Sequence, residues 1–330
     1  MTHSARSLPR PDVALRAAQA RQSLARCTLC AHRCAVDRTS GPAGACRSDS
    51  TTRVFHEGIE WAGEETLVPT YVVSLSGCNM TCSFCLTGGS SQNGQAGSIL
   101  DPEATAARIR NAAASLRSVT ILGGEPSIHL DGALEIAARI PPGLPLVWKT
   151  NAYASPEGLA LLEGIPDIVL ADYKFGDDDC AGRLANVPRY TEVVRANLKW
   201  AARTSRLIVR HLVMPGHLDC CLAGVVDWLA RELPDTPLSL MTGYLPVFRA
   251  ASDPVLGRTT RLAERRRADE IVGSRGVRRV PWILAPGAAS GPSPDDDVWI
   301  DRDGRICVDS ASTELVEILK RLNQEFVFTK

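Results

Sequence analysis

The sequence lacks any apolar run that approaches the roughly 18 residues needed to cross a bilayer. It also lacks an excess of charge, because 37 Lys and Arg residues balance 37 Asp and Glu residues. The first 22 residues contain no apolar core of the kind that signal peptides carry. We therefore expect a cytoplasmic protein with no membrane partner, and the charge balance does not indicate a surface that binds nucleic acid.

Cysteine, by contrast, is abundant, with eleven residues. Seven stand in two tight groups: Cys27, Cys30, Cys34 and Cys46, then Cys78, Cys82 and Cys85. In a reducing compartment such spacing indicates ligands of a metal or an iron-sulfur cluster rather than disulfides. The other four are predicted to be small buried or partly buried residues: Cys180, Cys220, Cys221 and Cys307.

The second group has one ligand too few for a closed site. Its pattern is C-x3-C-x2-C, with no fourth cysteine in the same loop. A structural zinc or a closed cluster takes four ligands. Three thiolates therefore predict a [4Fe-4S] cluster whose fourth iron is open to an external chelate. The first group, C-x2-C-x3-C-x11-C, can close a site around zinc or a second [4Fe-4S] cluster, and both fit these ligands about equally.

From about residue 70, short apolar runs alternate with stretches of helical spacing. Strands are predicted at residues 70–76, 118–123, 144–150, 167–174, 206–213 and 237–243, and helices at residues 101–116, 131–140, 155–162, 190–203 and 218–233. Asp101-Pro102 and Ser155-Pro156 are typical of helix N-termini. Six strand-helix units predict an α/β fold, a partial parallel (β/α)6 barrel of the TIM type.

The chain divides into three predicted domains. Residues 1–65 form a cysteine-rich module that shows no long periodic pattern and depends on its ligand to fold. Residues 66–250 form the partial barrel. Residues 251–330 form an extension with a solvated Arg-rich helix, a linker at residues 285–297, a β-hairpin turning at Asp303-Gly304, and a final helix.

The cysteine loop, with Phe84 before its third cysteine, resembles the signature of the radical S-adenosylmethionine superfamily, and the resemblance extends over about residues 70–250. It implies that the methionine amine and carboxylate of S-adenosylmethionine chelate the open iron. One electron then cleaves the cofactor to a 5'-deoxyadenosyl radical, which abstracts hydrogen from a substrate. In that chemistry Cys78, Cys82 and Cys85 are the catalytic ligands.

The resemblance also implies a cofactor pocket at the carboxyl ends of the strands. Gly123, Gly124, Glu125 and Pro126 are similar to the superfamily's GGEP motif, which meets the methionine amine. Asp172, Lys174 and His211 would surround the methionine and ribose, with Asn151 beside them. The alternatives are a plain Gly-Gly-x-Pro turn, an ion pair between Asp172 and Lys174 at the rim, and a satisfied core histidine.

Within the superfamily, the N-terminal block and the segment "VRHLVMPG" resemble relatives of the pyruvate formate-lyase activating enzyme. This implies an oxidoreductase that takes an electron from flavodoxin or ferredoxin and abstracts hydrogen from a glycine of a partner protein. Leu86-Thr87 departs from the residues that activating enzymes carry after the third cysteine. The alternatives are radical modification of a small molecule or peptide in a biosynthetic pathway, and a non-catalytic iron-sulfur or zinc protein.

Overall fold

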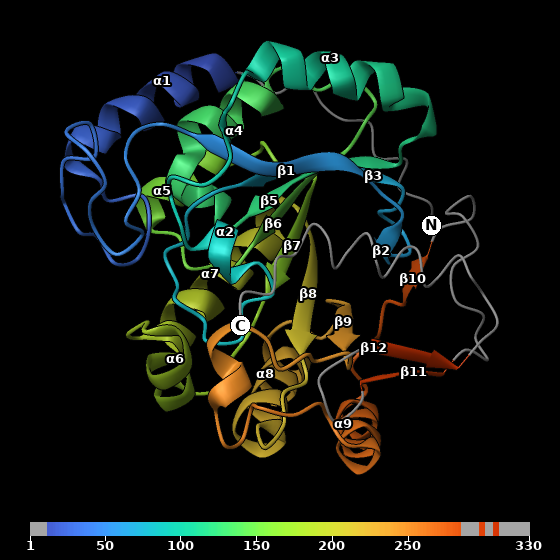
Figure 1. Ribbon diagram of the computed structural model, residues 1–330. Helices are drawn as coiled ribbons and strands as arrows, with labels where there is room; N and C mark the ends of the chain where they lie inside the picture. Colours follow the sequence, from blue (N-terminus) through green and yellow to red (C-terminus); the bar gives the residue numbers. More distant parts are fainter. Residues whose placement is uncertain (1–11, 285–296, 301–305, 310–330) are drawn as a thin grey trace.

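The main sheet of the computed structural model, which describes residues 12–284, 297–300 and 306–309, has the strand order β4-β1-β3-β5-β6-β7-β8-β9. Its parallel strands are β3 (Thr70–Leu75), β5 (Ser118–Gly123), β6 (Leu146–Thr150), β7 (Ile168–Asp172), β8 (Arg206–Leu212) and β9 (Leu238–Met241). These are the six predicted strands, and they stand side by side in chain order. The sheet curves but does not close (Figure 1), which confirms the partial barrel.

The predicted helices between the strands are also present. They are α3 (Pro102–Ala112), α4 (Leu130–Ala137), α5 (Pro156–Leu162), α7 (Tyr190–Thr204) and α8 (Gly224–Glu232). The side chain of Asp101 accepts from the backbone N–H groups of Glu103 and Ala104, both at 3.0 Å. Ser155 Oγ likewise accepts from the Gly158 N–H at 3.1 Å. Both predicted N-caps are therefore confirmed.

Several elements were not predicted. They are α1 (Val13–Ser23), β1 (Arg53–Glu60), β2 (Ala62–Glu64), α2 (Gly88–Ser91), β4 (Ser98–Ile99), α6 (Asp178–Ala185), and the short 3-10 segments η1 (Leu24–Arg26), η3 (Pro126–His129) and η5 (Phe248–Ser252). The 3-10 segment η2 (Ala113–Ser115) and the π-helix η4 (Leu218–Ala223) lie within the helices predicted at residues 101–116 and 218–233. Helix α1 packs on α4 (Figure 1), largely through small Ala17 and Ala20, which give a weak periodic signal. Strand β1 pairs antiparallel with β3, so the main sheet begins before residue 65.

The C-terminal part contains α9 (Leu262–Ser274), the predicted Arg-rich helix, which buries only Ala268, Ile271 and Val272. Strand β10 (Trp282–Leu284) returns to pair antiparallel with β2. Strands β11 (Asp297–Ile300) and β12 (Ile306–Asp309) also pair antiparallel, as the predicted hairpin requires. The linker up to residue 296, the turn at Asp303-Gly304 and the predicted final helix lie outside the described residues.

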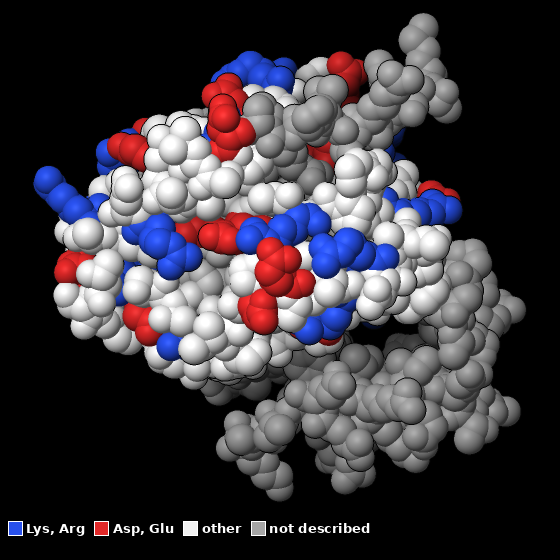
Figure 2. All heavy atoms as spheres, turned by 90° about the horizontal axis from the view of Figure 1, so that it is seen from above, with Lys and Arg blue, Asp and Glu red and all other residues white. Residues whose placement is uncertain are grey.

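One continuous apolar core fills the space between the sheet and its helices, and Val73, Ile121 and Val209 are fully buried in it. Most charged side chains lie on the surface, whereas Arg38, Glu64, Glu125 and Asp131 are buried. On the face shown in Figure 2, Lys and Arg side chains are interspersed with Asp and Glu. Arg139, for example, is paired with both Glu103 (2.6 Å) and Glu135 (3.1 Å). In the described part of the chain, no helix combines the length and apolar character needed to cross a membrane.

Candidate functional site

The cysteine loop follows β3 directly and is fixed by its backbone. Gly77 turns the chain with φ of 84°. The N–H groups of Thr81 and Ser83 then donate to the carbonyl oxygens of Ala185 and Leu184 at the end of α6, at 2.9 and 2.8 Å. These bonds hold residues 81–83 of the loop against α6, a helix that was not predicted from the sequence.

The three sulfurs of this loop lie in a mostly apolar setting. Cys78 and Cys82 are buried and Cys85 is partly buried. Cys78 Sγ accepts weakly from the backbone N–H of Met80 at 3.4 Å, and Cys85 Sγ lies 3.2 Å from Ser91 Oγ. Burial raises the pKa of Cys78, and the nearby Cys82 raises it further. Burial also raises the pKa of Cys82 to about 12, although Lys174 opposes this shift.

Such a donor set fits a multi-iron cluster better than a single ion. Among the described residues, the only group of three or more Cys, His, Asp or Glu ligand atoms all within 4.8 Å of one another lies elsewhere. A zinc ion holds its thiolates about 3.8 Å apart, given Zn–S bonds of about 2.3 Å and tetrahedral angles. At least two of the thiols of Cys78, Cys82 and Cys85 are therefore more than 4.8 Å apart, farther than two thiolates on one zinc ion.

Gly123 and Gly124 bring the end of β5 into direct contact with the cysteine loop. A Cβ on Gly123 would overlap the carbonyl oxygen of Leu75, and one on Gly124 would overlap that of Gly77. Gly123 has a φ of 145°, which side chains disfavour. The pair is therefore required for close packing of the two backbones, which a plain solvent-exposed turn would not need.

Glu125 is fully buried, and its carboxylate is held by neighbouring strand ends. Oε1 accepts from Ser127 Oγ at 2.6 Å and from Thr150 Oγ1 at 2.8 Å, and Oε2 accepts from the Asn151 N–H at 2.7 Å. Burial raises its pKa despite these bonds. The acid thus joins β5 to β6 and fixes the backbone of Asn151.

Asn151 connects Glu125 to the cysteine loop through hydrogen bonds. Its Nδ2 donates to Asn79 Oδ1 at 2.7 Å and lies 3.8 Å from Cys78 Sγ. Asn79 in turn donates from Nδ2 to the Tyr153 carbonyl at 3.1 Å. Asn79 was not predicted as a site residue, and its position next to Cys78 is the one feature of the sequence that points to it.

Asp172 and Lys174 form the ion pair that was considered as an alternative, with Nζ 2.8 Å from Oδ2. Both side chains are about a quarter exposed, at 24% and 22%. Burial acts to raise the pKa of Asp172, but Lys174, Lys149 and Arg210 outweigh it and lower the pKa to about 2. The pair therefore stands ionised at the carboxyl end of β7, facing Cys82.

His211 is buried, with Nδ1 2.8 Å from the Tyr173 carbonyl oxygen. Burial lowers its pKa to about 4, so the ring is neutral and donates from Nδ1. Phe84 is buried edge-on to Phe175, with ring centroids 6.0 Å apart. His211 is thus held by the backbone of the residue that follows β7, and Phe84 packs against an aromatic ring two residues further along.

The N-terminal cysteines line one small pocket. Its lining includes all four of them, together with Gly44, Arg38 and Ile128. Burial raises the pKa of Cys30 to about 12. The backbone of this segment is bonded to the barrel, since the Ala31 N–H donates to the Tyr153 carbonyl and the Ser155 N–H to the Leu29 carbonyl, both at 3.1 Å.

Comparisons with known proteins show the family to which this chain belongs. The family model of the radical SAM superfamily matches residues 72–229. An uncharacterized protein of Methanocaldococcus jannaschii is 32% identical over 254 residues, which cover 74% of this chain and 73% of that protein. The chain belongs to the radical SAM superfamily, and this membership implies a [4Fe-4S] cluster and S-adenosylmethionine as cofactors.

Solved structures with a similar fold are more distant. Streptococcus suis SuiB bound to its precursor peptide SuiA is 17% identical with a TM-score of 0.47, over 60% of this chain and 43% of SuiB. A radical SAM methyltransferase from Sphaerobacter thermophilus is 19% identical with a TM-score of 0.48, over 64% of this chain and 65% of that one. A domain of pyruvate-formate lyase-activating enzyme from Bacteroides vulgatus is 21% identical with a TM-score of 0.40, over 49% and 97%. This chain thus spans less than half the length of SuiB.

Proposed function

We propose that this protein is a radical SAM oxidoreductase that holds its [4Fe-4S] cluster at Cys78, Cys82 and Cys85. The observation that supports this best is that three thiols of one loop are not all within 4.8 Å of one another. Hydrogen bonds from the backbone of Thr81 and Ser83 to α6, and from Asn151 to Asn79, hold this loop in place. A buried hydroxyl between two of these cysteines, Ser83 Oγ, has no hydrogen-bond partner among the described residues. The separation of the thiols supports a group larger than a single ion.

When bound, the cluster supplies the electron that cleaves S-adenosylmethionine, and the cofactor supplies the hydrogen-abstracting radical. The protein's own residues bind and orient. Lys174 presents an ammonium for the methionine carboxylate, and Asp172 keeps that ammonium charged and in place. The carbonyl groups of Gly123 and Gly124 would accept from the methionine amine, and Asn151 and His211 would line the space for the nucleoside.

Glu125 acts in this proposal through the strand ends that it joins. Its carboxylate already accepts hydrogen bonds from Ser127, Thr150 and Asn151, so it keeps the β5 and β6 ends in register with the loop. Any contact to the methionine amine would add to this positioning role.

For the N-terminal module we propose a second [4Fe-4S] cluster rather than zinc. The four thiols of Cys27, Cys30, Cys34 and Cys46 line one cavity, yet in the described part of the chain they are not among the sulfurs close enough to share one ion. We keep residues 1–65, 66–250 and 251–330 as proposed domains. The abundance of free thiols supports a reducing, cytoplasmic location.

The proposed substrate is a glycine of a partner protein, as in activating enzymes, with flavodoxin or ferredoxin as electron donor. Radical modification of a small molecule or peptide is the competing proposal. Protein and small-molecule fractions of the source cells can be compared as stimulators of 5'-deoxyadenosine formation. Stimulation by a protease-sensitive fraction supports the partner protein, whereas stimulation only by the small-molecule fraction contradicts it.

The class itself is tested by anaerobic turnover. The iron-replete protein, reduced with dithionite, should release methionine and 5'-deoxyadenosine slowly without substrate. Replacing Cys78, Cys82 and Cys85 together by Ala should abolish this product and remove about four irons per chain, while about four remain at the N-terminal module. Unchanged iron in the triple variant would overturn the cluster assignment. Absence of 5'-deoxyadenosine even after addition of both cell fractions would favour a non-catalytic iron-sulfur protein.

A further inference from the structure

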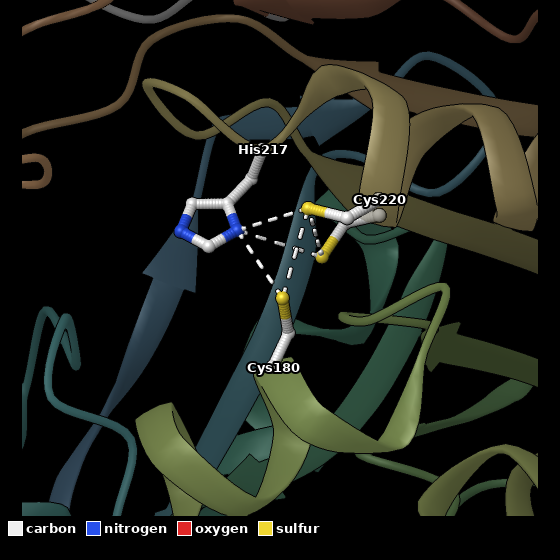
Figure 3. Close-up of side chains that lie close together, drawn as sticks. Cys180, His217 and Cys220 are labelled. Atoms are coloured by element: carbon white, nitrogen blue, oxygen red, sulfur yellow. Dashed lines mark hydrogen bonds between the residues drawn. The ribbon is translucent and has the colours of Figure 1, made fainter.

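A third set of ligand side chains lies outside both predicted groups. It consists of Cys180 on α6, His217 just before the π-helix η4, and the adjacent Cys220 and Cys221 within η4. Cys180, His217 and Cys221 are buried, and Cys220 is partly buried. Figure 3 shows that the side chains of Cys180, His217 and Cys220 point toward one another from two separate segments.

The distances between the ligand atoms are those of a single ion. His217 Nδ1 lies 3.3 Å from Cys220 Sγ, 3.4 Å from Cys180 Sγ and 3.8 Å from Cys221 Sγ. Cys220 Sγ lies 3.6 Å from Cys180 Sγ and 3.8 Å from Cys221 Sγ. A tetrahedral zinc with Zn–S bonds of about 2.3 Å and Zn–N bonds of about 2.0 Å separates its sulfurs by about 3.8 Å and nitrogen from sulfur by about 3.6 Å.

Hydrogen bonding alone does not explain why four such groups converge. Thiols are weak donors and weak acceptors, and an imidazole nitrogen can satisfy only one of three sulfurs with a proton. Hydrogen bonds among three thiols and one ring nitrogen therefore stabilise this cluster of side chains only weakly. A cation that binds all four lone pairs accounts for the arrangement.

The surrounding charge also suits a metal. Three thiolates and one neutral imidazole around Zn²⁺ leave one net negative charge, which a nearby cation offsets. Arg183, one turn after Cys180 on α6, places its guanidinium Nη2 3.9 Å from Cys180 Sγ. Gly176 approaches so closely that a Cβ there would overlap the Cys220 and Cys221 carbonyl oxygens, so the backbone packs tightly against the site.

We propose that Cys180, His217, Cys220 and Cys221 bind one structural zinc ion. A Cys3His set fills all four positions of tetrahedral zinc and leaves none for chemistry. The ion ties α6 to η4. Because the carbonyl groups of Leu184 and Ala185 in α6 hold the backbone of Ser83 and Thr81, the zinc braces the cysteine loop from outside.

Metal analysis of the full chain, purified anaerobically from zinc-supplemented cells, tests this site. We expect about one zinc per chain, and zinc-edge X-ray absorption with three sulfurs and one nitrogen in the first shell. Cys180→Ser should lose that zinc and keep its iron, whereas Cys307→Ser, the matched control outside all three groups, should keep both metals. Hydrogen exchange at the Thr81 and Ser83 amides should be faster in Cys180→Ser than in the control.

Loss of folding in Cys180→Ser would not decide the question, so His217→Cys provides a second arm. This variant keeps four ligands, and we expect it to retain zinc with an all-sulfur shell. Zinc absent from the wild type, an all-sulfur shell in the wild type, or a Cys180–Cys220 disulfide in the anaerobic protein would each overturn the proposal. None of these readouts depends on turnover of S-adenosylmethionine, so the proposed function can fail without this site failing.

Discussion

Arg38 donates a hydrogen bond from its buried guanidinium to the backbone carbonyl of Ile128, 90 residues later in the chain. Arg38 is only 1% exposed, and its other donors reach the carbonyl oxygens of Ser48 at 3.0 Å and Asp49 at 2.7 Å. Ile128 belongs to η3, directly after Glu125. One cation therefore couples the N-terminal cysteine segment to the segment that orders the proposed cofactor site.

Replacing Arg38 by Leu should destabilise the protein strongly. The buried carbonyl groups of Ser48 and Ile128 and the partly buried one of Asp49 would lose their donor, at about 1–3 kcal/mol for each buried group. Urea unfolding should show a loss of at least about 3 kcal/mol. Arg267→Leu is the control, because its pair with Glu270 is exposed and should change stability by about 0.5 kcal/mol or less. Equal stability of the two variants would contradict the coupling.

Replacing Lys174 by Ala should weaken S-adenosylmethionine binding while the iron content stays the same. A lost charge-assisted contact costs about 1.5–3 kcal/mol, or roughly ten- to a hundredfold in Kd. Equilibrium dialysis with labelled cofactor measures this. Lys199→Ala removes an exposed pair with Glu232 and should bind as the wild type does. Wild-type affinity in Lys174→Ala would remove this residue from the pocket.

Gly124→Ala should disturb the protein more than any ordinary surface change. The new methyl group would meet the Gly77 carbonyl oxygen, so the cysteine loop must shift, at a cost of about 1–3 kcal/mol or more. We expect lower stability and incomplete cluster loading by iron analysis. Gly273→Ala in α9 has open space around it and should be neutral or stabilise by up to about 1 kcal/mol. A Gly124→Ala protein with full stability and iron would contradict the close approach.

His211 should make stability depend on pH between about 6.5 and 4. Burial holds its pKa at about 4 in the folded protein, so only the unfolded chain takes up the proton in this window. Its contribution is fully present above pH 6.5 and is lost as the pH falls, by at most about 1.4 kcal/mol per unit. Anaerobic urea titrations at pH 5.0 and 6.5 should show a smaller difference for His211→Asn than for the wild type. Identical differences would place the ring in contact with water.

The parallel strands could be predicted from the sequence because they are buried on both faces of the sheet. Such strands consist of continuous apolar runs, such as Val72-Val73 in β3. The sequence predicted neither α6, which begins with Asp178 and Asp179, nor α1, whose buried face is mostly alanine. The cysteine loop was visible because its members are a few residues apart. Cys180 and His217 are 37 residues apart and meet only in the folded chain, so the third ligand set was interpreted as buried thiols.

The order of the parallel strands also has a consequence for synthesis on the ribosome. Each parallel strand after β3 pairs with the parallel strand made before it, while β4 joins β1 at the other edge, so the parallel part of the sheet can grow at one edge as the chain emerges, with little waiting for distant partners. Strand β2, made before all of them, must wait for β10. Glu64 on β2 contacts Arg210 and Ser239 on the last two parallel strands, β8 and β9. The nascent barrel is therefore left without this support until more than 280 residues have been translated.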